Sequence, residues 1–179
     1  KISISPSIKT ISENTFKRFT SVKEIIIPSS VTNIEYSAFN GCQSLEKVEL
    51  FDNIEKIDVC VFYGCTSLKE INLPSSLKVV NCFMLFGCTS LTELNMPDSV
   101  KQIGRYSLSN CTSLTVVKMS QKLNGIGEAA FKGCTSLVEI QLPMQLRIID
   151  HRAFEGCEKL KTISYLTFGC EYDDDEVDY

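Results

Sequence analysis

Histidine is almost absent from this chain, since His151 is the only one among its 179 residues. No second imidazole exists to share a proton relay or a metal site with it, and we expect His151 at the surface. Paired catalytic carboxylates, a glycine-rich phosphate loop and a nucleophile elbow are absent as well. We therefore predict that the chain is not an enzyme and that it uses no metal and no cofactor.

Long apolar runs and segregated positive charge are also lacking. No run approaches the roughly 18–20 apolar residues that span a membrane, and no signal peptide or lipid anchor is visible, so we expect no direct membrane insertion. Six acidic residues lie among the final nine, which leaves 16 of the 22 acidic residues against 18 basic ones in the body. A nearly neutral body without a basic stripe argues against nucleic acid as a partner. We expect the acidic tail to be a solvated end.

A 23-residue period organises the rest of the sequence. One column of this period is apolar in every unit and holds Val22, Leu45, Leu68, Leu91, Leu114, Leu137 and Leu160. The period contains no insertion. A spacing held this strictly predicts a solenoid of stacked, similar coils.

Each unit has the pattern of a strand, a proline turn and a second, shorter extended piece. The segment L-x-x-I-x-L alternates as a half-buried strand does, and proline follows it at positions 28, 74, 97 and 143. After the second extended piece we expect one helical turn, closed by a residue in the left-handed conformation. Glycine holds that position in five units, and Asn110 holds it in another.

Nine cysteines suggest a metal or disulfide interpretation, but six of them form one interior column: Cys42, Cys65, Cys88, Cys111, Cys134 and Cys157. Coils about 4.8 Å apart carry these side chains in parallel, whereas a disulfide needs Cβ atoms that converge to about 3.5–4.5 Å. We expect the column to stay reduced, each thiol acting as a small apolar filler. Cys60, Cys82 and Cys170 lie outside it, and a bridge between Cys60 and Cys82 on neighbouring coils stays open.

The recurring pattern S-L-x-x-I-x-L-P-x-S-V-x-x-I-x-x-x-A-F-x-G-C-T resembles the BspA-like (Treponema pallidum type) class of leucine-rich repeats. The resemblance covers residues 1–165 as about seven 23-residue repeats and leaves residues 166–179 as a C-terminal end and acidic tail. It implies a leucine-rich-repeat solenoid of the α/β horseshoe class, dominated by strands. Such a solenoid is a right-handed, curved coil with a parallel β-sheet on its concave face and short strands or single helical turns on its convex side.

The resemblance also implies a non-catalytic protein-binding module. Members of this class are typically cell-surface or secreted adhesion and recognition proteins of bacteria or parasitic protists, which bind host matrix or cell-surface proteins. The alternative is an intracellular, cytoplasmic scaffold or regulatory repeat protein. Unfinished solenoid ends add self-association to these expectations.

We expect a binding site on the concave face of the sheet. Side chains two and four positions after the leucine column point outward there and form a polar, mildly acidic strip. The strip consists of Glu24, Ile26, Lys47, Glu49, Glu70, Asn72, Glu93, Asn95, Val116, Lys118, Glu139 and Gln141. The alternative is a solvated sheet face without a partner. If the strip binds, a basic protein segment fits it better than nucleic acid or an anionic polymer does.

A second candidate is an apolar patch in the middle units, where other units carry polar residues. It consists of Tyr63, Phe83, Phe86 and Tyr106. Apolar side chains in exposed columns mark a contact surface. In the alternative interpretation, Phe83 or Phe86 folds inward to fill the space left where Leu85 and Leu108 replace the phenylalanine of other units.

Overall fold

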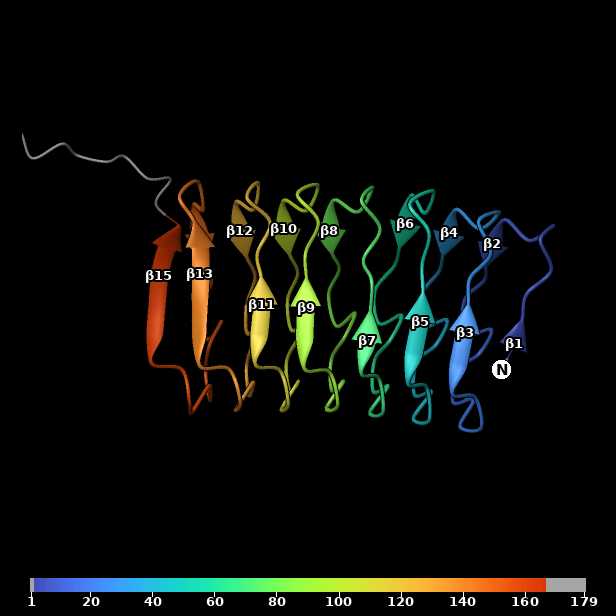
Figure 1. The fold of residues 1–179 in the computed structure, drawn as a ribbon, viewed down its shortest axis with the longest axis horizontal. Coiled ribbons are helices and arrows are strands. Elements are labelled where there is room, and N and C mark those ends of the chain that lie inside the picture. The colour runs from blue at the N-terminus through green and yellow to red at the C-terminus, as the bar shows by residue number, and fades with distance from the viewer. Residues whose placement is uncertain (1, 167–179) are drawn as a thin grey trace, which may run out of the picture.

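The computed structural model describes residues 2–166 and shows a solenoid with two rows of parallel strands (Figure 1). The long-strand row contains β1 (Ile2–Ser3), β3 (Glu24–Ile26), β5 (Lys47–Glu49), β7 (Glu70–Ile71), β9 (Glu93–Asn95), β11 (Val116–Lys118), β13 (Glu139–Pro143) and β15 (Thr162–Leu166). The short-strand row contains β2 (Thr10–Ile11), β4 (Asn33–Ile34), β6 (Lys56–Ile57), β8 (Val79–Val80), β10 (Gln102–Ile103), β12 (Gly125–Ile126) and β14 (Ile148–Ile149). The predicted solenoid of parallel strands is confirmed. The acidic tail lies outside the described residues.

Every strand pair joins residues that are 23 positions apart. Lys47 of β5 pairs with Glu24 of β3 on one side and with Glu70 of β7 on the other. In the short-strand row, Ile103 of β10 pairs with Ile126 of β12. Because the pairing is in phase with the sequence period, each sequence column becomes a stack of side chains, one coil apart.

The apolar columns fill the interior. Phe39 stacks on Phe62 with 5.5 Å between ring centroids and 5° between ring planes, and Phe131 stacks on Phe154 at 5.4 Å and 10°. Leu85 is fully buried in the same column. Stacked aromatic pairs add about 0.5–1.5 kcal/mol each beyond the area that they bury. Each coil therefore depends on its neighbours for stability.

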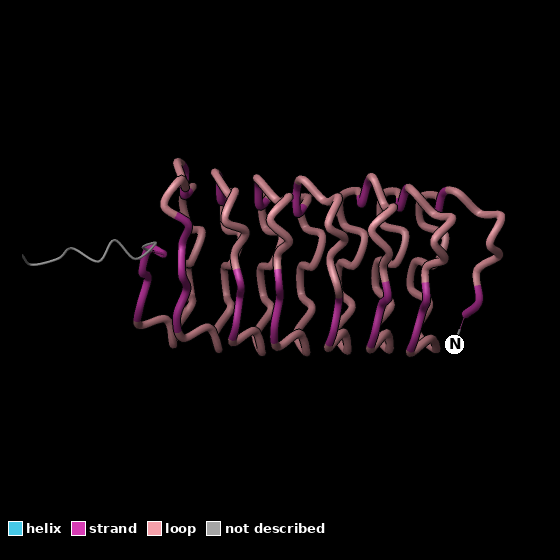
Figure 2. The backbone as a smooth tube through the Cα atoms, turned by 45° about the horizontal axis from the view of Figure 1, so that its top comes forward, coloured by secondary structure: helices cyan, strands magenta, loops and turns pink. Residues whose placement is uncertain are grey.

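The helical turn expected before each glycine is wrong, and no helix occurs within residues 2–166 (Figure 2). These segments are consecutive β-turns. The N–H of Ala38 donates to the carbonyl of Glu35 at 3.2 Å, whereas the next N–H, that of Phe39, donates to Val61 of the following coil at 3.0 Å. Alternate N–H groups thus point along the solenoid axis and bond to the next coil, which an α-helix with its i to i−4 bonds does not permit.

Two columns of left-handed residues produce these turns. The predicted column is confirmed, with φ of 66–73° at its five glycines and 61° at Asn110. The second column was not predicted, and it consists of Asn14, Ser37, Cys60, Phe83, Tyr106, Ala129 and Arg152, with φ of 52–60°. Side chains such as phenylalanine and tyrosine are rare in this conformation, so no residue type marked the column in the sequence.

The cysteine column does more than fill space. Each of its thiols donates to a carbonyl oxygen of the aromatic column, as Cys65 Sγ does to Phe39 at 3.2 Å and Cys111 Sγ to Leu85 at 3.3 Å. Burial raises the pKa of the Cys111 thiol to about 12, so this group keeps its proton. The eight cysteines of the described residues are free thiols, as predicted for the column, and Cys170 lies outside these residues.

The hydrogen-bonded ladders of both rows are interrupted at the same place. In the long-strand row, β1, β3, β5 and β7 form one sheet, and β9 pairs with β11 in another. In the short-strand row, β2, β4 and β6 are separated in the same way from β8, β10, β12 and β14. We term this boundary, between the coil of β6 and β7 and the coil of β8 and β9, the seam. Among residues 2–166, it is the only boundary that neither row crosses, because the further break between β11 and β13 affects the long-strand row alone.

Candidate protein-binding surfaces

The long-strand row carries the predicted strip on its outer face. In β9, Glu93 and Asn95 are exposed on either side of the buried Leu94. Strands β11 and β13 repeat this alternation. In β3, the outward-facing Glu24 and Ile26 are half-buried. The strip residues therefore lie together, as the strand period requires.

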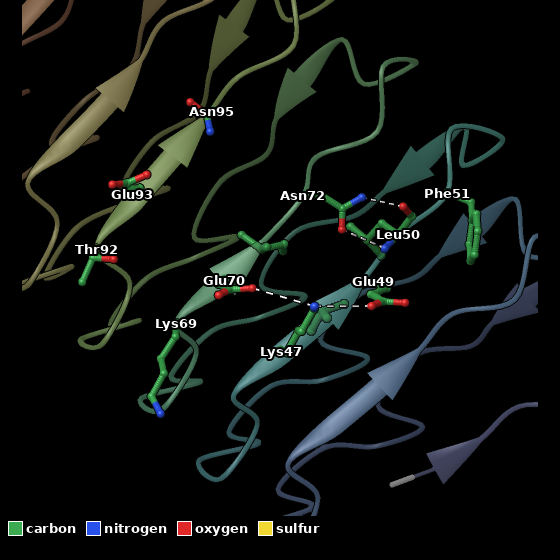
Figure 3. Close-up of a pocket in the computed structure, with 12 residues that line it drawn as sticks. Lys47, Glu49, Leu50, Phe51, Lys69, Glu70, Asn72, Thr92, Glu93 and Asn95 are labelled. Carbon is green, nitrogen blue, oxygen red and sulfur yellow. Dashed lines mark hydrogen bonds and ion pairs between the residues drawn. The ribbon is translucent and has the colours of Figure 1, made fainter.

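Charges along the strip are only partly paired. Lys47 Nζ lies 3.4 Å from Glu49 Oε1 and 3.9 Å from Glu70 Oε2 (Figure 3). These groups are solvent-exposed, so each pair contributes about 0–1 kcal/mol at most. Within residues 2–166, Glu93 and Glu139 have no cationic partner. Glu70 and Glu93 lie on adjacent coils and line one hollow, although no strand ladder joins β7 to β9.

A hollow of about 770 Å³ opens over β5, β7 and β9, at the seam. Asn72 lies in its wall (Figure 3). Its side-chain amide donates to the carbonyl of Leu50 at 2.6 Å, and its Oδ1 accepts from the N–H of Leu50 at 3.1 Å. This side chain therefore replaces the backbone ladder past the end of β7 and is less available to a partner than the strip pattern predicts.

The four aromatic residues of the apolar patch form a ridge of half-buried rings. Tyr63 stacks on Phe86 at 4.8 Å, Phe83 stacks on Tyr106 at 5.2 Å, and the tilted pair of Phe83 and Phe86 joins the two stacks at 5.9 Å. The two stacked pairs join rings of neighbouring coils. The guanidinium of Arg105 lies 5.1 Å from the centre of the Tyr106 ring, within cation–π range.

An ion cluster beside this ridge was missed by the sequence analysis. Arg105 Nε lies 2.9 Å from Glu128 Oε2, and His151 Nε2 lies 3.3 Å from Glu128 Oε1. His151 also contacts Asp150 Oδ1 through Nδ1 at 2.9 Å, and hydrogen bonds from its backbone N–H and its ring lower the pKa of Asp150. The 23-residue spacing of Arg105, Glu128 and His151 was the available signal, because it places them in one column. His151 is exposed, as expected.

Residues 2–166 contain no group of three or more histidine, cysteine, aspartate or glutamate side chains arranged to hold a metal ion. They also contain no helix with the length and hydropathy to cross a membrane.

The two rows of parallel strands, repeated every 23 residues, define a leucine-rich repeat solenoid. The chain matches the family described as "BspA type Leucine rich repeat region" in six copies, over residues 1–115 and 61–170. It therefore belongs to the BspA-type leucine-rich repeat family. Repeats of this family generally serve protein interaction and are typically non-catalytic. A comparison with curated proteins finds no match.

Solved structures of three bacterial proteins are similar to this chain. A leucine-rich repeat protein of Bacteroides ovatus is 32% identical, with a TM-score of 0.81, over 88% of this chain and 41% of its own. The leucine-rich repeat protein of T. pallidum is 32% identical, with a TM-score of 0.82, over 86% of this chain and 72% of its own. A protein of Faecalibacterium prausnitzii, described as a leucine-rich cell surface protein, is 28% identical, with a TM-score of 0.76, over 88% of this chain and 43% of its own. The chain thus spans less than half the length of two of these proteins.

Proposed function

We propose that the chain is a non-catalytic protein-binding module of a cell-surface or secreted protein and that it acts in recognition or adhesion. The observation that carries this proposal is the hollow at the seam, which lies within the polar strip of the long-strand row. Ligand sites in repeat proteins commonly lie on such extended sheet surfaces. The cell-surface description of the F. prausnitzii relative supports the location.

The charges around the hollow favour a basic segment of a host matrix or cell-surface protein. Three glutamates and two lysines line it. One of these lysines, Lys69, is already paired with Glu46 at 2.9 Å. The electrostatic potential of the hollow is therefore negative. It attracts positively charged segments and raises their association rate at low ionic strength.

The test is binding of the chain to immobilised matrix proteins and to intact cells, at low and at high ionic strength. The variant Glu70→Lys/Glu93→Lys reverses charge in the hollow. The matched control Glu13→Lys/Glu55→Lys makes the same change at exposed residues outside the long-strand row. Circular dichroism verifies that each variant is folded. We expect the first variant to lose binding by tenfold or more and the control to bind like the unmodified chain.

Two results would redirect the proposal. Binding that survives Glu70→Lys/Glu93→Lys but fails in a folded Phe83→Ser/Phe86→Ser variant would move the site to the aromatic ridge. No binding to any extracellular protein or cell would contradict an adhesion role for this chain and would favour an intracellular scaffold, which pull-downs from cytosol then test. Self-association remains a separate prediction, which sedimentation equilibrium tests.

A further inference from the structure

The seam is held together differently from the other boundaries between coils. No strand ladder crosses it in either row. The side-chain amide of Asn81 donates to the carbonyl of Ile57 at 2.6 Å. At neighbouring coils, the backbone N–H of the equivalent residue donates the corresponding hydrogen bond. Backbone bonds remain in the β-turn segments, where Phe62 N–H donates to Met84 at 2.9 Å. The β-turn side therefore carries most of the hydrogen bonding across the seam.

Two cysteines outside the buried column lie next to each other at this point. The N–H of Cys60 donates to the carbonyl of Cys82 at 3.2 Å, directly across the seam. Adjacent coils are about 4.8 Å apart, and Cys82 lies one residue out of register with Cys60, so their Cα atoms are roughly 5–6 Å apart, within the range of about 4.4–6.8 Å that disulfides occupy. Two coils further on, the equivalent residues Tyr106 and Glu128 bring their side chains together, with Oη and Oε1 3.4 Å apart.

Access distinguishes these two thiols from the column cysteines of their own two coils. Cys60 and Cys82 are half-exposed, whereas Cys65 and Cys88 on the same two coils are fully buried. The buried thiols also donate to carbonyl oxygens, as Cys88 Sγ does to Phe62 at 3.3 Å. Small oxidants reach accessible thiols before fully buried ones, so on these two coils oxidation is directed to the pair at the seam.

We propose that Cys60 and Cys82 are a modification site that forms a disulfide across the seam, by exchange with a small disulfide of the glutathione class. The thiolate of one cysteine attacks the small disulfide, forms a mixed disulfide and releases one small thiol. The thiolate of the other cysteine then attacks the protein sulfur of the mixed disulfide and releases the second small thiol. Two protein thiols are thereby oxidised to one disulfide, the small disulfide is reduced to two thiols, and both protons pass to these thiols.

The disulfide fastens the two coils at the boundary where strand pairing is missing. It stabilises the closed seam without changing the strip or the buried core. The proposal does not depend on the proposed binding function.

The test uses the full chain with Cys157→Ser and Cys170→Ser, because Cys157 is half-buried as well, so that among the described residues Cys60 and Cys82 are the thiols that are not fully buried. The folded protein is incubated with oxidised glutathione, quenched with N-ethylmaleimide and analysed by intact mass and peptide fragmentation. We expect the loss of two hydrogens and a link between Cys60 and Cys82. Single Cys60→Ser and Cys82→Ser variants serve as controls, because tryptic peptides 57–69 and 79–101 each also contain a column cysteine. Each control should acquire one glutathione and no internal link.

Amide hydrogen exchange measures the effect on the seam. We expect exchange at Phe62 and Gly64, whose N–H groups cross the seam, to slow by tenfold or more in the oxidised protein and to recover with dithiothreitol. Stable glutathione adducts on both cysteines without an internal link would overturn the proposal. A link that persists in Cys60→Ser would also overturn it, and unchanged exchange after oxidation would refute the fastening of the seam.

Discussion

Ser107 is the position where the structure makes the sharpest prediction about stability. Its side chain is fully buried, and its hydroxyl has no hydrogen-bond partner. The equivalent residues of other coils include Ala38 and Ala130, which are also fully buried. Replacement of Ser107 by alanine therefore removes an unpaired polar group and introduces a side chain that the fold already accepts at this column.

The expected magnitude follows from two opposing effects. A buried hydroxyl without a partner costs about 1–3 kcal/mol, and its removal recovers that free energy. The small void left by one oxygen atom offsets part of the gain. We expect Ser107→Ala to raise the free energy of unfolding by about 1 kcal/mol, which corresponds to about 2–4 °C in Tm for a chain of this size.

Urea denaturation followed by circular dichroism measures this change, and Ser120→Ala is the matched control. Ser120 is equally buried, but its hydroxyl accepts the N–H of Lys122 at 3.1 Å. The same substitution there leaves a donor unpaired and should destabilise the protein by about 1 kcal/mol. Destabilisation by Ser107→Ala, or equal effects at the two serines, would refute the reasoning.

Three further predictions concern two glycines, the buried thiols and the side chain of Asn72. Gly104→Ala should destabilise the protein by about 2 kcal/mol or more, because the new Cβ would lie 2.7 Å from a backbone nitrogen of the previous coil. Gly87→Ala should cost only about 1 kcal/mol for its φ of +70°, since the new Cβ would have no neighbour nearer than 3.9 Å. Thermal denaturation compares the two variants. The free energy of unfolding should fall as pH rises above about 9, since unfolded thiols then ionise while burial holds the pKa of Cys111 at about 12. Urea titrations at about pH 8 and about pH 10.5 should show a smaller fall in Cys111→Ala, and an identical fall would contradict the assignment. Asn72→Ala should cost about 1–2 kcal/mol by removing both hydrogen bonds to Leu50, and no change in Tm would show that these bonds add nothing to stability.

The local pattern of the sequence predicted which residues are buried and where the chain turns. The cysteine and phenylalanine columns lie inside, as at Cys111 and Phe62. The glycine column is left-handed, and Asn110 substitutes for glycine there. These features depend on the size, polarity and backbone preference of single residues, repeated with a constant period.

The consecutive β-turns could not be predicted in this way. A single helical turn and a pair of β-turns have similar sequence preferences, and the choice depends on whether N–H groups such as that of Phe39 find carbonyls in the next coil. The hydrogen bonds donated by the thiols of the cysteine column were missed for the same reason, since the carbonyl that accepts each one belongs to a residue 26 positions away.

The sequence by itself thus determined the solenoid, its 23-residue register and the set of residues on its outer face. Only the tertiary structure decided where the strand ladders stop, that Asn72 and Asn81 bond to neighbouring coils, and that Cys60 and Cys82 meet at the seam. The physical reason is that burial follows from each residue's own chemistry. Hydrogen bonds between coils require donor and acceptor to lie within about 3 Å, and that distance is set jointly by the packing of every side chain between them.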